Sequence, residues 1–315
     1  MASKPYRIIF MGTPEFAVPS LQALLAGPDQ VVAVVTQPDR PCGRGRKLTE
    51  PPVKTLALAA GIPVLQPASV RTPEFLAELK SHQPDLIAVT AYGRILPGPL
   101  LNLPPLGTLN VHGSLLPRYR GAAPIQWSIL NGDKTTGITI MQMDEGLDTG
   151  AMLLVESLAI SPDDTAATLA TRMSELGGKL LCQALAKLHQ GTLVATPQND
   201  ADATLAPPLT KERGLIDWTM PAEVLSCRVR CLDPWPTAFT FLKGQRLRLF
   251  APTVVAGESL ETPGTILRAD LRGLLVATGQ DHLLFKEIQL DSGKRMPISA
   301  FLRGRELATG TILGL

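Results

Sequence analysis

Two polar side chains stand two residues apart near the middle of the chain, at Asn110 and His112. In a β-strand, side chains two residues apart point to the same face, so these two would project side by side. An amide can donate a hydrogen bond to a developing oxyanion, and an imidazole can polarise a carbonyl and move a proton. The stretch therefore predicts a catalytic site for chemistry at a carbonyl group.

A short apolar turn follows at once, formed by Ser114, Leu115, Leu116 and Pro117. Proline fixes its own φ angle and lacks an N–H, which makes the turn stiff. Two leucines in such a turn could line an apolar slot for a flat ring. They could equally pack beneath a helix, and the residue types alone do not separate these two interpretations.

An acidic turn, residues 144–150, separates two later strand patterns and contains Asp148. His112 and Asp148 are 36 positions apart, which is enough for a helix and a returning strand. If the fold brings the two together, the carboxylate could orient the imidazole and stabilise its charged form. Turns rich in Asp and Gly often have no further role, and no histidine lies beside the acids to suggest a metal site.

A basic segment lies between the second predicted strand and its helix. Its cations are Arg40, Arg44, Arg46 and Lys47. Contact with phosphate groups is the natural interpretation of such a segment, and a solvated charged loop is the alternative. A loop of this length also needs a reason to exist in a compact domain, which favours a binding role.

The first half of the chain alternates between strand and helix patterns. Expected strands cover residues 7–11, 31–36, 85–91 and 109–112, and expected helices cover 15–25, 51–60 and 72–82. This alternation predicts an α/β, Rossmann-like domain with a parallel-rich sheet. Ligands bind beyond the carboxyl ends of the strands in such sheets, which is where His112 is expected. The turn after the first strand lacks the G-x-G-x-x-G pattern, which argues against a nicotinamide enzyme.

The second half predicts two further strands at 136–143 and 151–159 and a long helix at 166–190. Residues 191–208 mix Thr, Pro, Asn and Asp with few apolar anchors, as a linker does. Short strand patterns with turn residues between them follow in 209–315 and predict a small OB-like β-barrel, or else a sandwich. We therefore expect a catalytic domain at 1–190, a linker at 191–208 and a C-terminal domain at 209–315.

Composition sets broad limits on the class of protein. The chain has 315 residues, 45% of them hydrophobic and 18% charged, which is ordinary for a soluble globular protein. Residues 1–208 carry a net charge of −1 and residues 209–315 of +3, too small an excess to prove a nucleic-acid partner. The four cysteines form no CxxC pair, which favours free thiols in a reducing cytosol over structural zinc. No apolar run approaches the roughly 18 residues of a membrane helix, so a cytoplasmic protein is expected.

The pattern Asn110-x-His112-x-Ser114-Leu115-Leu116-Pro117, with Asp148 in an LDTG turn, resembles the folate-dependent formyltransferases. The resemblance extends along the chain to the members of that family that act on methionyl-tRNA. The segments that carry it are MGTPEFA at 11–17, TQPDRPCGRGRKL at 36–48, GLIDW at 214–218 and DPWP at 233–236.

The resemblance implies a reaction, a donor and an acceptor. The formyl group of 10-formyltetrahydrofolate would pass to the α-amine of methionyl-initiator tRNA, and no metal is expected. Asn110, His112 and Asp148 would be catalytic, and Ser114 to Pro117 would hold the folate. Arg40, Arg44, Arg46 and Lys47 would contact the tRNA, with Arg44 the strongest candidate. The C-terminal domain would add phosphate contacts, and the enzyme is expected to be a monomer.

Four other functions compete with this one. Formyltransferases of amino-sugar nucleotides and of glycinamide ribonucleotide carry the same core motif, but the basic segment and the second domain argue against them. A non-catalytic tRNA-binding module is disfavoured by the complete set of Asn110, His112 and Asp148. A hydrolase that releases formate from the same donor would need water in place of the amine.

Overall fold

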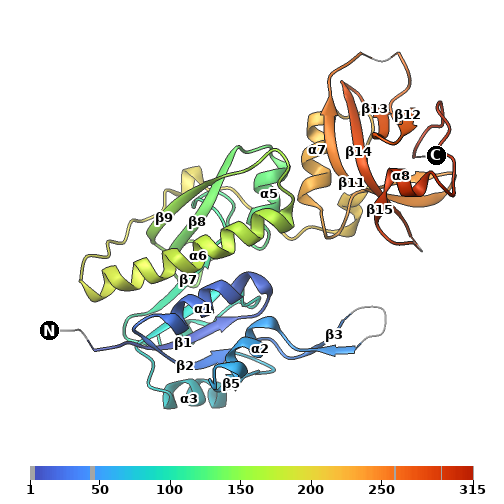
Figure 1. The fold of residues 1–315 in the computed structure, drawn as a ribbon. Coiled ribbons are helices and arrows are strands. Elements are labelled where there is room, and N and C mark those ends of the chain that lie inside the picture. The colour runs from blue at the N-terminus through green and yellow to red at the C-terminus, as the bar shows by residue number, and fades with distance from the viewer. Residues whose placement is uncertain (1–3, 43–46, 259, 292, 315) are drawn as a thin grey trace. The chain divides into compact units, whose positions relative to one another are not determined.

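The computed structural model describes residues 4–42, 47–258, 260–291 and 293–314, and only the backbone at Cys42 and Lys47 (Figure 1). By its contacts the chain divides into two compact units. Unit 1 contains Met1–Gly121, Thr136–Ala159 and Ala170–Ala206, and unit 2 contains Ala122–Thr135, Ile160–Leu169 and Pro207–Leu315. None of the described helices combines the length and apolar character that a membrane span requires.

Unit 1 is built on a seven-stranded sheet with the order β5-β2-β1-β6-β7-β8-β9. The strands are β1 (Arg7–Gly12), β2 (Gln30–Val35), β5 (Val64–Leu65), β6 (Leu86–Thr90), β7 (Thr108–His112), β8 (Thr135–Gln142) and β9 (Met152–Ala159). Strands β5, β2, β1, β6 and β7 pair in parallel, and β8 pairs antiparallel to β7. The prediction of a parallel-rich α/β sheet is therefore confirmed.

Helices connect these strands. They are η1 (Glu15–Ala17), α1 (Val18–Ala26), α2 (Pro52–Ala59), α3 (Pro73–Ser81), α4 (Gly98–Leu101) and α6 (Ala166–His189), whose first residues belong to unit 2. The central strands β1 and β6 are continuous apolar runs whose residues are almost wholly buried, as expected for a sheet covered on both faces. One large cluster of the core packs Ile9 and Met11 of β1 and Ile87 of β6 against Phe75 and Leu79 of α3.

The strand register places the polar residues of β7 at the carboxyl edge of the parallel strands. Asn110 pairs with Val89 of β6, and Val89 pairs with Met11 of β1. Asn110 therefore lies level with the penultimate residues of β6 and β1, and His112 lies two residues further along β7. This is the edge at which open α/β sheets bind ligands.

The basic segment begins and ends as a small hairpin. Strand β3 (Arg40–Cys42) pairs antiparallel with β4 (Lys47–Thr49) in a sheet of its own. Propensity alone gave no sign of these strands. Arg40 is exposed and its Nη2 donates to Oε1 of Gln37 at 3.3 Å. Arg44 and Arg46 lie outside the described residues, and at Lys47 only the backbone is described.

Unit 2 is built on a six-stranded antiparallel sheet, which confirms the predicted β-rich C-terminal region. The order is β10-β11-β14-β13-β12, and β15 also pairs with β14. The strands are β10 (Phe239–Leu242), β11 (Gln245–Val255), β12 (Ile266–Asp270), β13 (Gly273–Ala277), β14 (His282–Leu290) and β15 (Met296–Pro297). Its core includes Trp218, whose ring meets Phe285 edge-on and whose Nε1 donates to Thr240 Oγ1 at 3.1 Å.

Helices complete unit 2. They are α5 (Pro124–Leu130), η3 (Lys211–Gly214), α7 (Ala222–Cys231) and α8 (Ile298–Phe301). Helix α5 packs on α7 within this unit, although it lies before β8 in the sequence. Cys227 and Cys231 are buried free thiols on α7, and burial raises the pKa of Cys231 to about 12. The predicted boundaries at 190, 191–208 and 209 stay a prediction.

Candidate active site at the carboxyl edge of the unit 1 sheet

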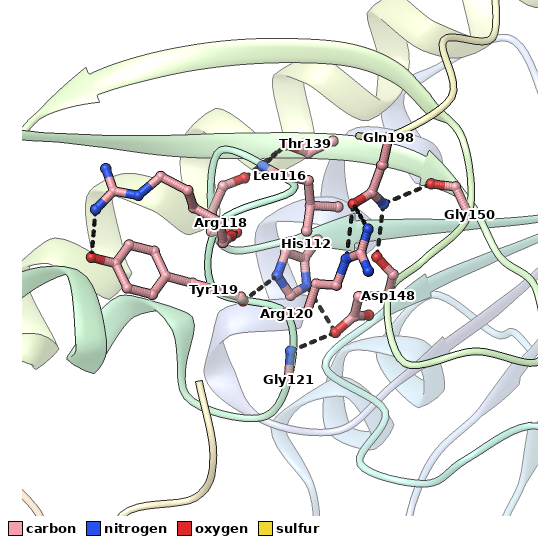
Figure 2. A network of polar contacts seen from close by, with 11 residues as sticks. His112, Leu116, Arg118, Tyr119, Arg120, Gly121, Thr139, Asp148, Gly150 and Gln198 are labelled. Atoms are coloured by element: carbon pink, nitrogen blue, oxygen red, sulfur yellow. Dashed lines mark hydrogen bonds and ion pairs between the residues drawn. The ribbon is translucent and has the colours of Figure 1, made fainter. Parts of the chain in front are cut away.

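His112 and Asp148, which are distant in sequence, meet at the end of β7. Nδ1 of His112 lies 3.7 Å from Oδ2 of Asp148, and the two side chains are 5% and 15% exposed (Figure 2). The other ring nitrogen, Nε2, lies 3.0 Å from the backbone oxygen of Tyr119. A carbonyl oxygen can only accept, so the neutral imidazole carries its proton on Nε2. Nδ1, which carries no proton in this tautomer, is therefore the ring nitrogen that faces Asp148.

Asp148 is held in place by backbone contacts on the acidic turn. Its φ of 54° is in the left-handed region, which Asp and Asn tolerate better than most residues. Its Oδ2 accepts a hydrogen bond from the N–H of Gly121 at 2.8 Å. Asp144, in the same turn, accepts instead from the N–H of Gly146 and the hydroxyl of Thr149. The structure thus separates the two aspartates of the turn, because Asp144 closes the turn and Asp148 faces the histidine.

Asn110 lies on the same face of β7 as His112, because two residues separate them on one strand. Its side chain makes no hydrogen bond to any residue that the structure describes. The amide is therefore free to donate to an oxygen that enters the site.

Thr139 of β8, which the sequence reasoning missed, fastens the apolar turn to the sheet. Its buried hydroxyl donates to the carbonyl of Ser114 at 2.7 Å and accepts from the N–H of Leu116 at 3.1 Å. The Ser114 hydroxyl in turn donates to the carbonyl of Arg118 at 2.6 Å. The only signal in the sequence was a threonine at an alternating strand position, and threonine is ordinary in strands.

The two leucines of this turn are packed rather than open. Leu116 is buried, and the side chain of Leu115 occupies the space that a Cβ on Gly137 of β8 would need. The turn nevertheless follows directly on His112, at the end of β7. The prediction that Ser114 to Pro117 hold the folate stays a prediction.

The chain matches two family models that together span nearly all of it. Residues 6–185 match the formyl transferase model, and residues 208–306 match the formyl transferase C-terminal domain model. The chain belongs to the formyl transferase family. The resemblance seen in the sequence is thereby confirmed at the family level.

Relatives of this formyl transferase match over almost their full length. The methionyl-tRNA formyltransferase of Desulfotalea psychrophila is 58% identical over 98% of this chain and 96% of its own. That of Ruminiclostridium cellulolyticum is 51% identical over 98% of this chain and 99% of its own. HypX from Aquifex aeolicus, solved in complex with tetrahydrofolic acid, shares the fold with a TM-score of 0.63. It is 18% identical, and the match covers 95% of this chain and 47% of HypX.

Replacing Thr139 by valine keeps the shape of the side chain in this formyl transferase and removes its hydroxyl. We expect the free energy of unfolding to fall by about 1–3 kcal/mol, because the Ser114 carbonyl and the Leu116 N–H lose their partner in a buried place. Urea unfolding followed by circular dichroism measures the change.

Thr136, on the same strand, is the matched control. Its buried hydroxyl has no partner among the described residues, so Thr136→Val should leave stability unchanged or raise it slightly. Equal losses in the two valine variants would show that Thr139 does not fasten the turn.

Proposed function

We propose that this protein transfers the formyl group of 10-formyltetrahydrofolate to the α-amine of methionyl-initiator tRNA, giving N-formylmethionyl-tRNA for translation initiation. The observation that carries the proposal is the His112–Asp148 pair at the sheet edge of a chain that resembles methionyl-tRNA formyltransferases from end to end. The proposal includes that the protein acts as a monomer and that it acts in the cytoplasm.

Asn110 stabilises the charge that develops on the formyl oxygen. When the amine attacks the formyl carbon, a C–N bond forms and the carbonyl oxygen becomes an oxyanion. An amide N–H already aimed at that oxygen costs no reorganisation during the reaction. The side chain of Asn110 is suited to this role because no described residue occupies its donors.

His112 and Asp148 handle the proton that the amine must lose. Nε2 is engaged with Tyr119, so Nδ1 is the ring atom that can exchange a proton with the reacting groups. The Asp148 carboxylate at 3.7 Å stabilises the imidazolium that forms when Nδ1 takes that proton. The oxyanion then re-forms the carbonyl, the bond from the formyl carbon to N10 of the folate breaks, and N10 receives the proton that His112 took from the amine. This assigns His112 to proton transfer, and polarisation of the carbonyl falls mainly to Asn110.

The surroundings of Asp148 fit the flat ring of a folate. The first residue of α4 contacts the acidic turn, because Glu145 fills the space beside Gly98. The loop that leads into α4 exposes Ile95 (74% exposed), and the acidic turn exposes Leu147 (57% exposed). Two exposed apolar side chains on neighbouring segments beside the proposed catalytic carboxylate can cover the faces of an aromatic ligand. The bound donor supplies the activated formyl group.

A second surface in unit 2 fits the tRNA. A hollow of ≈ 600 Å³ is lined in part by Lys211, Arg246 and Arg248, together with Trp235. Arg246 lies 4.2 Å from the ring centroid of Phe239, and the Trp235 ring is 56% exposed. Cations beside an exposed aromatic ring are suited to RNA, because the cations contact phosphates and the ring stacks on a base. The β3–β4 hairpin, with Arg40 and the neighbouring cations of the basic segment, is the other proposed tRNA contact.

Two substitutions in this hollow should weaken tRNA binding in different ways. Lys211→Ala should flatten the plot of log affinity against log salt by about one unit of slope, because one phosphate contact is lost. Trp235→Ala should cost about 1–3 kcal/mol of binding with little change in slope, because stacking is not ionic. Filter binding of charged initiator tRNA across a salt series measures both.

Lys80→Ala removes an exposed cation from α3 and is the control for net charge. If Lys211→Ala and Lys80→Ala change the slope equally, the hollow is not a tRNA contact. Wild-type affinity for Trp235→Ala would exclude base stacking there.

The decisive experiment uses donor labelled in the formyl carbon. We expect transfer of label to methionine on the initiator tRNA, far slower transfer to the same amino acid on the elongator tRNA, and little free formate. Label released as formate without any acceptor would indicate a hydrolase. Binding of charged tRNA with no transfer would indicate a non-catalytic module.

A further inference from the structure

The segment predicted as a linker forms part of the wall of the catalytic site. Residues 198–206 belong to unit 1 and contact both chain segments that hold the His112–Asp148 pair. We infer that Gln198 is a positioning residue for formyl transfer and that it acts by fixing the turn that carries Asp148. This inference rests on the function proposed above.

The side-chain amide of Gln198 uses all of its hydrogen-bonding capacity in this place. Nε2 donates to the backbone oxygens of Asp148 and Gly150, each at 2.7 Å (Figure 2). Oε1 accepts from Nε and Nη2 of Arg120 at 3.0 and 2.9 Å. An amide has two donor hydrogens and an oxygen with two lone pairs. Here each hydrogen has a carbonyl oxygen as acceptor, and each lone pair has a guanidinium N–H as donor.

Arg120 fixes which way the amide faces. A guanidinium can only donate, so Oε1 of Gln198 must point to Arg120 and the NH₂ group must point to the turn. Arg120 is itself buried, and its charge is balanced by Asp200, whose Oδ1 lies 2.7 Å from Nη2. A fully satisfied network of this kind is rigid, and a change in one member leaves the others without partners.

The backbone of the turn needs this support. Asp148 has a φ of 54°, and a residue other than glycine keeps such a conformation when its surroundings determine it. Two anchor points two residues apart, the carbonyls of Asp148 and Gly150, converge on one nitrogen atom of Gln198. Asp148 is then held at two points. Gln198 holds its backbone carbonyl, and the N–H of Gly121 holds its carboxylate.

The same segment fixes the histidine from the other side. The Thr204 hydroxyl accepts from the N–H of Tyr119 at 2.9 Å, and the carbonyl of Tyr119 is the partner of Nε2 of His112. The backbone N–H of Arg120 donates to the carbonyl of Thr204, and the N–H of Ala206 donates to the carbonyl of Arg120. A Cβ on Gly121 would lie 2.9 Å from the carbonyl oxygen of Ala206, so the chains are in close contact here. One segment thus sets the separation of the two catalytic side chains.

Gln198→Glu is the substitution that tests this role. It keeps the size of the side chain and its contact with Arg120, but it turns an acceptor toward two carbonyl oxygens and pushes the turn away. We expect the single-turnover rate at saturation to fall about ten- to a hundredfold, while KM for tRNA and folate stays within about twofold. Gln22→Glu, on the exposed face of α1, makes the same charge change and should behave as wild type. A wild-type rate for Gln198→Glu would overturn the inference.

A double-mutant cycle shows whether Gln198 acts through Asp148. In an Asp148→Asn background the added Gln198→Glu change should lower the rate by less than about twofold, because there is no catalytic carboxylate left to misplace. If the two losses multiply, Gln198 acts elsewhere and the inference is wrong.

Hydrogen exchange tests the positioning without any assay of activity. Peptides that cover residues 144–151 should exchange faster in Gln198→Glu, and peptides from β1 should be unchanged. If wild type transfers no formyl group to any acceptor, the proposed function fails, but this measurement still reports on the turn. Unchanged exchange at 144–151 would overturn the positioning role. If Gln198→Glu does not fold, Gln198→Met removes the two hydrogen bonds to the turn, together with those to Arg120, without added charge and carries both measurements.

Discussion

Alanine in place of Asn110 should lower the rate of formyl transfer about a hundred- to a thousandfold. This is the loss expected when one preorganised donor to an oxyanion is removed. The fold should be kept, because the Asn110 side chain is only partly buried and has no hydrogen-bond partner among the described residues. Truncation therefore leaves no buried group unpaired. Single-turnover transfer from labelled donor to charged initiator tRNA measures the rate.

Two further variants define the result for Asn110. Asn110→Asp has the same shape but no donor, and it should be at least as slow as the alanine variant. Asn102→Ala changes an exposed asparagine at the end of α4 and should retain full activity. Folate binding by Asn110→Ala should stay close to wild type, since the lost bond forms mainly in the transition state. A rate within about threefold of wild type would remove Asn110 from the mechanism.

Asparagine in place of Asp148 should lower the single-turnover rate about a hundredfold or more. Assisted proton transfer contributes on this scale, and the substitution removes the negative charge that faces Nδ1 of His112. Asparagine also tolerates the φ of 54° and can accept the hydrogen bond from Gly121, so the turn should persist. The loss would then report on the charge and not on the fold.

Asp144→Asn is the matched control for Asp148→Asn. Asp144 lies in the same turn, and an amide oxygen at that position can still accept from Gly146 and Thr149. It should behave as wild type. His112→Ala should be about as slow as Asp148→Asn, and combining the two changes should add little, because residues that act as a unit are not additive. Near-normal single-turnover rates for Asp148→Asn would exclude Asp148 from the proton path.

Periodicity was enough to predict most elements of the α/β unit. The apolar runs of β1, β2 and β6 and the helical spacing of α3 are local patterns, and they predicted each element to within a few residues. The β3–β4 hairpin and α7 were missed. Arg40–Cys42 has no strand pattern of its own, and polar residues interrupt the apolar spacing of α7, so their structure depends on tertiary contacts.

The sequence by itself determined the chemistry of this protein. The types and spacing of Asn110, His112 and the turn after them indicated carbonyl chemistry at a strand end, because a strand places alternate side chains on one face. The same residues carried the resemblance to the formyl transferase family, which the two family models confirm.

Only the tertiary structure decided how those side chains are held. It brought Asp148 to 3.7 Å from His112, directed Nε2 of the ring to Tyr119, and placed Gln198 beneath the acidic turn. The contact between His112 and Asp148 joins side chains 36 positions apart, and Gln198 reaches a backbone carbonyl 50 positions away. Nε2 of His112 also contacts a backbone carbonyl, that of Tyr119. Every residue carries a backbone carbonyl, so no pattern of side chains in the sequence predicts which carbonyls these side chains contact.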